Sequence, residues 1–153
     1  MKSGCGVFDA GPLISFHQTD TLWLPEALFE HVVVPVAVAA EVKRSLGLGP
    51  EWFEISSPRI RLLLPEQLGP GEREAIGLAM EIGSDFVVLD DLPARNAALA
   101  HGLPVVGTLG LLVKAKQRGL VSEVRPLMDA MVAAGHYASD RLQALILETA
   151  GEA

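Results

Sequence analysis

Short apolar runs alternate along this chain with longer stretches of helical periodicity, and turn-forming residues separate them. The strand candidates are residues 6–9, 32–34, 86–89 and 104–106. The predicted helices are residues 13–16, 36–44, 72–82, 93–101, 109–118, 126–134 and 140–149. Such alternation is typical of βαβ units wound around a parallel sheet. We therefore expect a three-layer α/β/α fold with a central, mainly parallel sheet.

The middle of the chain follows a different pattern. Residues 46–58 are rich in glycine and proline, which predicts a surface loop. Residues 59–64 alternate charged and apolar side chains before becoming wholly apolar, which predicts an edge strand or a strand entering the sheet. No repeat, low-complexity segment or linker interrupts the sequence. We expect residues 1–153 to form one domain.

Composition excludes several classes of protein. Half of the residues are hydrophobic and only 20% are charged, so the chain is not a disordered tail. The apolar run 32–40 is far shorter than the roughly 18 residues that span a membrane, and Pro35 interrupts it. The single cysteine, Cys5, excludes an internal disulfide and a multi-cysteine metal site. Without a leader-like segment, we expect a cytoplasmic protein that does not enter a membrane.

The net charge of −7 bears on the partner. Proteins that bind nucleic acid usually carry a basic patch, and the candidates here are short: 43–44, 59–61 and 114–118. An acidic balance reflects either ordinary solubility or carboxylates gathered to hold divalent cations. Charge alone does not decide between these interpretations.

Two strand candidates end in acidic residues, namely Asp9 and the pair Asp90 and Asp91. Ligands of an open parallel sheet bind outside the carboxyl ends of its strands. If the two strands are neighbours, the acids project into one crevice. The alternative is that each acid caps the turn or helix that follows it.

Glu41 lies in the predicted helix 36–44 among small apolar residues. A carboxylate on a largely buried helix is costly unless a positive group meets it, which favours a functional role. The alternative is that a polar stripe begins at Glu41, since Lys43 and Arg44 follow. Glu72 and Glu74 open the next long helix, where the helix dipole favours acids as ordinary caps.

Together these acids form a set of four or five carboxylates. Like charges in one pocket raise one another's pKa, and a divalent cation removes the conflict. Oxygen ligands favour Mg²⁺ or Mn²⁺, and the four histidines lack metal-ligand spacing. Ions held in this way polarise a phosphate and activate water, which is the chemistry of nucleases.

Five segments resemble motifs of the PIN-domain family, which has a Rossmann-like fold. They are residues 7–14, 34–42, 71–76, 88–95 and 106–120, and the resemblance covers roughly residues 5 to 150. The resemblance is to the toxin-type, VapC-like ribonuclease branch. It implies Mg²⁺- or Mn²⁺-dependent cleavage of RNA, a homodimer, and silencing by a small antitoxin protein.

The resemblance also implies site residues. Asp9, Glu41, Glu72 and either Asp90 or Asp91 would be catalytic metal ligands, and the other member of the pair would orient Arg95 or a water. Two positions depart from the family pattern. Gly11 stands where Ser or Thr is frequent, and Glu72 stands where toxin members usually have Asp, which is one methylene shorter.

Other interpretations stay open. A PIN-like fold without turnover would bind RNA or a protein partner. A flavodoxin-like receiver would need its acid pair directly after the first strand, whereas Asp90 and Asp91 come late. A metal-free ribonuclease would need clustered His and Lys, which are lacking. The homodimer prediction also rests on apolar positions that recur in the C-terminal helices, although these could pack on the domain's own core: Met128, Met131, Leu142, Leu145 and Ile146.

Overall fold

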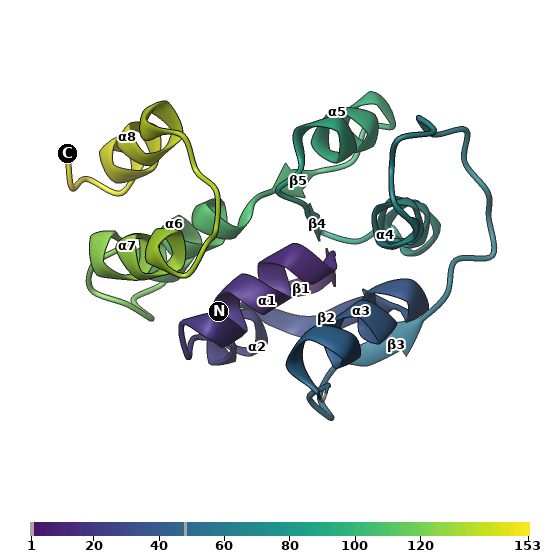
Figure 1. The fold of residues 1–153 in the computed structure, drawn as a ribbon, viewed down its shortest axis with the longest axis horizontal. Coiled ribbons are helices and arrows are strands. Elements are labelled where there is room, and N and C mark those ends of the chain that lie inside the picture. The colour runs from purple at the N-terminus through teal and green to yellow at the C-terminus, as the bar shows by residue number, and fades with distance from the viewer. Residues whose placement is uncertain (1, 48) are drawn as a thin grey trace.

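A five-stranded sheet forms the centre of the computed structural model, which describes residues 2–47 and 49–153 (Figure 1). The strand order is β3-β2-β1-β4-β5, and each neighbouring pair is parallel. The strands are β1 (Ser3–Phe8), β2 (Phe29–Pro35), β3 (Glu54–Ser56), β4 (Phe86–Val88) and β5 (Val105–Val106). The expected α/β fold with a parallel sheet is therefore confirmed. A flavodoxin-like receiver has the order 2-1-3-4-5, so that alternative was wrong.

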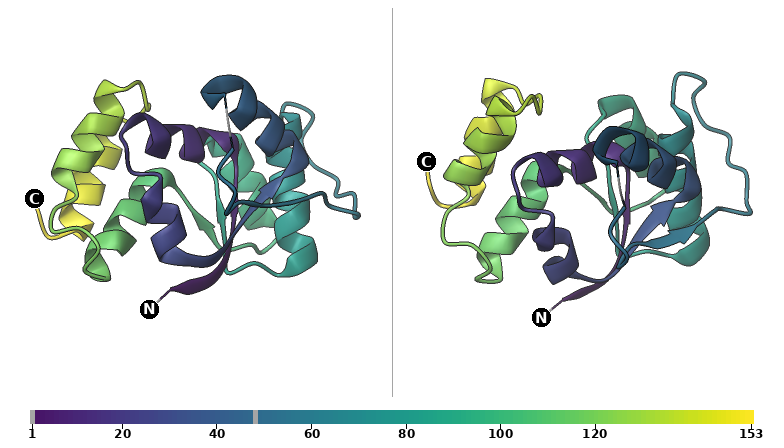
Figure 2. Two further views of the ribbon diagram at one scale, coloured as in Figure 1. Left: turned by 90° about the horizontal axis from the view of Figure 1, so that it is seen from below. Right: turned by 60° about the horizontal axis from the view of Figure 1, so that its bottom comes forward.

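Helices cover both faces of the sheet. They are α1 (Ala10–Gln18), α2 (Trp23–Leu28), α3 (Val36–Leu46), α4 (Pro70–Ile82), α5 (Leu92–Ala100), α6 (Thr108–Gln117), α7 (Arg125–Ala133) and α8 (Asp140–Thr149). Because successive strand residues point to opposite faces, Val7 packs with α4 and α5, whereas Phe8 packs with α1, α2 and α6. The last two helices lie on the opposite side of the molecule from residues 57–69 (Figure 2).

The sequence located most helix ends well. α3 ends at Gly47 with φ of 84°, and α4 ends at Gly83 with φ of 62°. Only glycine adopts these left-handed conformations without a steric cost, which is why glycine stops a helix. α1 begins at Ala10, earlier than expected, because Pro12 fits the first turn of a helix.

The middle of the chain needs correction. The predicted strand at 59–64 was wrong: residues 59–64 form no strand, and Leu62 and Leu64 pack against the cluster around α4 instead. The edge strand is β3, inside the predicted loop 46–58, where Ile55 pairs with Val34. Residue 48 of that loop lies outside the described residues. The short helix α2 was not predicted.

Glu152 ties the C-terminus to the rest of the fold. Its carboxylate accepts hydrogen bonds from the backbone N–H groups of Val124 and Arg125, at 2.7 and 3.0 Å, and from Lys116 Nζ at 3.0 Å. These donors lower the pKa of Glu152 to about 2. Of the helices within the described residues, none has the length and apolar character to cross a membrane.

Candidate metal centre

The carboxyl ends of β1 and β4 form the base of the site. The two strands are neighbours, with Phe8 opposite Val88, and the backbone N–H of Asp9 donates to Val88 O at 3.1 Å. Asp9 therefore leaves the sheet beside the segment that carries Asp90. This confirms the expectation that acids from two neighbouring strands project from the same edge of the sheet.

Asp9 and Glu41 meet over Gly71. A Cβ atom added to Gly71 would lie 3.2 Å from Asp9 Oδ1 and 3.6 Å from Glu41 Oε2, with a Val38 methyl also at 3.2 Å. Gly71 belongs to the first turn of α4. The absence of a side chain there lets α4 pack close to both carboxylates, and both act electrostatically on its next residue, Glu72, or are acted on by it.

The Asp9 carboxyl is strongly perturbed. Burial, together with the negative charges of Glu72, Glu41 and Asp90, raises the pKa of Asp9 from 3.8 to about 7, although a hydrogen bond from the Ala10 N–H opposes the rise. The perturbation shows that acids far apart in the sequence share one electrostatic environment. Such a carboxyl gains most from a nearby cation.

Glu72 has one satisfied and one unsatisfied oxygen. Oε1 accepts from the backbone N–H of Gly69 at 3.3 Å, in a capping arrangement at the start of α4. Oε2 is buried and has no hydrogen-bond partner among the described residues. Burial raises the pKa of Glu72, as do the charge and close approach of the Asp91 carboxyl and the charge of Glu41, against the hydrogen bond from the Gly69 N–H. A buried acceptor without a donor is costly, and a bound cation would remove that cost.

The two acids of the pair have different surroundings. Asp90 receives two hydrogen bonds from Thr108, from its N–H to Oδ1 at 2.9 Å and from its hydroxyl to Oδ2 at 2.6 Å. Asp91 caps α5 by accepting from Ala94 N at 3.3 Å and lies toward Glu72. Arg95 donates to the carbonyl of Leu89 at 2.8 Å, so it braces this turn through the backbone.

The expectation that the helix carrying Glu41 is largely buried was wrong. α3 buries only Val38 and Val42, and Glu41 is exposed, because the helix packs through one narrow apolar face. Of its alanines, Ala37 and Ala39 are half-buried and Ala40 is exposed. Oε2 of Glu41 nevertheless lies near Gly71, as Oδ1 of Asp9 does. Glu74 has a structural role, since its Oε1 accepts from the Ala37 N–H at 3.2 Å and so caps α3.

The donor set fits a hard divalent cation. The acids at this edge of the sheet influence one another electrostatically, one of their carboxyls has a raised pKa, and one oxygen lacks a donor: Asp9, Glu41, Glu72 and the pair at residues 90–91. The distances are not yet those of coordination. Within residues 2–47 and 49–153, no three His, Cys, Asp or Glu side chains are close enough together to hold an ion.

Sequence reasoning missed two residues beside the acids. Thr108 is fully buried and fixes Asp90, and its position after a strand and a glycine was the available signal. His136 was assigned no role. Its Nδ1 lies 2.9 Å from the hydroxyl of Ser15, and it lines two cavities with Asp90. No local signal predicts that contact, because 121 residues separate Ser15 from His136.

A family model described as a PIN domain (DUF3368) matches residues 5–152. The fold is similar to that of a PilT N-terminus domain protein from the hyperthermophilic archaeon Sulfolobus solfataricus P2, with a TM-score of 0.51 and 13% identity over 88% of this chain and 99% of that one. No curated protein matches the sequence. Because the family model spans nearly the whole chain, the protein belongs to the PIN-domain family, whose members are generally nucleases.

Proposed function

We propose that this protein is a divalent-metal-dependent ribonuclease whose metal ligands are Asp9, Glu41, Glu72 and the pair Asp90 and Asp91. The approach of Asp9 and Glu41 to Gly71, beside a buried Glu72 Oε2 that has no hydrogen-bond partner among the described residues, carries the proposal. The raised pKa of Asp9, caused first by burial and then by the charges of the neighbouring acids, supports it. PIN domains generally use divalent ions and act on RNA, which supports Mg²⁺ or Mn²⁺ as the cofactor.

Each acid has a distinct task in this proposal. Glu72 would ligate through its free Oε2, and Asp90 through oxygen lone pairs that Thr108 leaves unused while holding the carboxylate in one orientation. Asp9 and Glu41 would complete the set from the other side of Gly71. When bound, the ion supplies Lewis-acid activation of a phosphodiester and of water.

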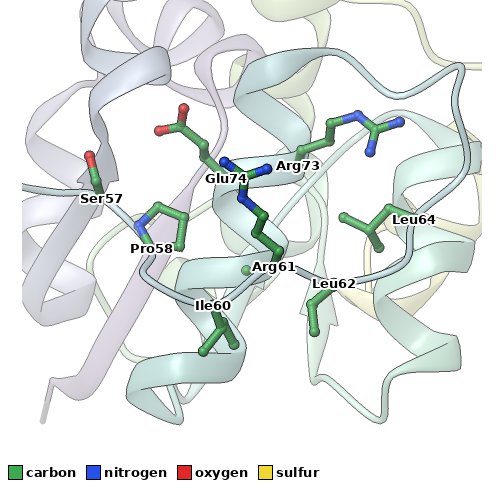
Figure 3. Close-up of a pocket in the computed structure, with 9 residues that line it drawn as sticks. Ser57, Pro58, Ile60, Arg61, Leu62, Leu64, Arg73 and Glu74 are labelled. Carbon is green, nitrogen blue, oxygen red and sulfur yellow. The ribbon is translucent and has the colours of Figure 1, made fainter.

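Cations near the acids would hold the RNA backbone. Arg61 and Arg73 line a cavity of about 370 Å³ beside α4 (Figure 3). Arg73 is fixed by hydrogen bonds to the carbonyls of Leu68, at 3.0 Å, and Pro65, at 2.5 Å. Arg73 and Glu72 are successive residues of α4 and point in different directions, so a phosphate bound there would lie on a neighbouring side of this helix from the carboxylates. Phosphate contacts of this kind position a strand without reading its sequence.

The proposed biological setting is that of a toxin in a toxin–antitoxin pair, in the VapC-like branch. A small antitoxin with basic side chains would be attracted to the carboxylate cluster. We also propose one domain spanning residues 1–153, a cytoplasmic location and a homodimer. Met128 and Met131 are buried in the protein's own core, so the dimer now rests on the exposed Leu142 and Leu145 of α8. Sedimentation as a monomer at micromolar concentration would contradict the dimer.

Calorimetric titration with Mn²⁺ and Mg²⁺ tests the metal site. We expect saturable binding by the native protein that is lost in Asp9→Asn and Glu72→Gln. Glu74→Gln is the matched control, since it lies two residues from Glu72 but caps α3, and its amide oxygen still accepts from Ala37. RNA cleavage assays with the same variants follow. A native protein that binds neither ion at millimolar concentration would exclude the active nuclease.

A second candidate is a PIN domain that binds RNA or a protein without cleaving. It is favoured by the spacing of the acids, of which no three among the described residues stand at metal-binding distance. In addition, both oxygens of Asp90 already accept hydrogen bonds from Thr108. This candidate predicts RNA binding that does not depend on divalent ions.

A further inference from the structure

A cavity of about 480 Å³ opens beside the carboxylates, between α1 and the turn that joins α7 to α8. Gly11, Ile14, Ser15 and Gln18 line one side, and their spacing places them on one face of α1. Residues 134–137 line the opposite side. Asp90 and Asp91 complete the wall, so the cavity is continuous with the proposed metal site.

The lining suits a nucleotide. Tyr137 is 87% exposed, which leaves its ring available for stacking. Ile14 supplies an apolar surface, and Gln18 supplies both a hydrogen-bond donor and an acceptor. The volume falls within the range of small-molecule sites, which runs from about 300 to 1,000 Å³.

His136 is held at the back of this cavity. Its Nδ1 lies 2.9 Å from the hydroxyl of Ser15, a residue that is only 7% exposed. The hydrogen bond occupies one edge of the imidazole, and Nε2 lies on the other edge. The contact also fixes the α7–α8 turn against α1, so the neighbouring Tyr137 is presented from an anchored backbone.

Gly11 lines the cavity without being required by packing, because a Cβ atom there would have no neighbour within 4 Å. Asp90, His136 and Tyr137 also line a second cavity of about 580 Å³ toward α6 and α8, which gives a strand two adjoining recesses.

We propose that the cavity between α1 and the α7–α8 turn binds an unpaired nucleobase of the RNA, next to the phosphate at the carboxylates, by stacking on Tyr137. This inference rests on the proposed nuclease function and adds a specific base-binding site to it. Stacking contributes to affinity with every base, and the Gln18 amide would distinguish among them.

The test is RNA binding by the full chain, with Ca²⁺ in place of Mg²⁺ to prevent cleavage. The probe is a fluorescein-labelled single-stranded RNA of about ten nucleotides, followed by fluorescence anisotropy. Tyr137→Ala should weaken binding about tenfold, from the usual contribution of one stacked base, whereas Tyr137→Phe should stay within about twofold of the native protein. Trp23→Ala is the matched control, because it removes an exposed aromatic residue from α2, which leads into the amino end of β2.

Abasic probes locate the contact. Removing the stacked base from the RNA should weaken binding by the native protein about tenfold and should have no further effect on Tyr137→Ala. The inference would be overturned if Tyr137→Ala and the native protein bind the RNA equally well. It would also be overturned if the losses of affinity from Tyr137→Ala and from base removal add independently. Burial of Tyr137 in a protein dimer, seen as self-association that Tyr137→Ala abolishes, would overturn it as well.

The outcomes also separate this inference from the proposed function. If the native protein cleaves RNA, and the Tyr137→Ala variant binds and cleaves RNA as well as the native protein does, only the base-binding site is refuted. A native protein that neither binds nor cleaves RNA would refute both the site and the nuclease.

Discussion

Asp9→Asn should stabilise the metal-free protein in a pH-dependent manner. The pKa of Asp9 is about 7 in the folded protein and near 3.8 when unfolded. Below pH 4 the carboxyl is protonated in both states and contributes no penalty. As the pH rises from 4 to 7, the unfolded chain loses this proton and the folded protein keeps it, so the free energy of unfolding falls. Above pH 7 the carboxyl is ionised in both states, and the free energy of unfolding falls no further from this cause.

The size of the effect follows from the same pKa values. Each unit of pKa corresponds to about 1.4 kcal/mol, so ionised Asp9 costs on the order of 4 kcal/mol. Asn has nearly the same shape, can still accept from the Ala10 N–H, and carries no charge. Asp9→Asn and native protein should therefore unfold alike at pH 4, and the variant should melt roughly 8–16 °C higher at pH 8.

Thermal unfolding followed by circular dichroism, in buffers with a chelator, measures this gap at each pH. Asp129→Asn, on an exposed position of α7, controls for loss of one negative charge and should produce no such pH profile. Adding Mn²⁺ at pH 8 should raise the melting temperature of the native protein and leave Asp9→Asn unchanged, because ligand binding to the folded state stabilises it. A gap that is constant with pH, or that is largest in acid, would refute the reasoning.

Three further changes have defined outcomes. Gly71→Ala and Gly11→Ala both place a methyl group in the first turn of a helix. The methyl of Gly71→Ala meets Asp9 and should reduce the Mn²⁺ affinity measured by calorimetry, whereas the methyl of Gly11→Ala meets open space and should leave that affinity unchanged. Thr108→Val removes the hydroxyl donor to Asp90 and should cost about 2 kcal/mol in denaturant unfolding and about tenfold in metal affinity; unchanged affinity would contradict its positioning role. Glu152→Ala leaves three donors without their acceptor and should lower the melting temperature while metal binding persists; an unaltered melting temperature would show that the C-terminus is not held there.

The sequence predicted the acids better than it predicted their surroundings. Asp9 and Asp90 follow strands whose apolar character is local, so their common edge could be inferred once the strands were assigned as parallel neighbours. The burial of Glu41 could not be inferred, because it depends on how narrow a face α3 presents to the core. β3 was missed because its three exposed residues carry no apolar pattern, and its pairing with β2 rests on backbone contacts and on one side-chain contact between distant residues, His31 Nδ1 to Glu54 Oε2 at 2.6 Å.

The cavity beside the acids depends on contacts between distant segments. Ser15 meets His136 only because the chain returns across α1 after α7. Similarly, Thr108 reaches Asp90 because β5 pairs with β4, which places the start of α6 beside the end of β4. Neither residue type is informative by itself. Such contacts are visible only when the sheet order is known.

The magnitudes also bear on the cation proposed for this edge of the sheet. In a parallel α/β fold each helix returns antiparallel to the strands, so α1, α4, α5 and α6 all begin at the edge where Asp9 lies. Each helix N-terminus stabilises a nearby anion by about 0.3–1 kcal/mol. The cost of ionising Asp9 is on the order of 4 kcal/mol even with the Ala10 N–H donating to it, so the helix ends reduce the repulsion without removing it. The remaining negative potential is what a divalent ion would neutralise, and an isolated phosphate would be repelled from the same place unless such an ion were bound first.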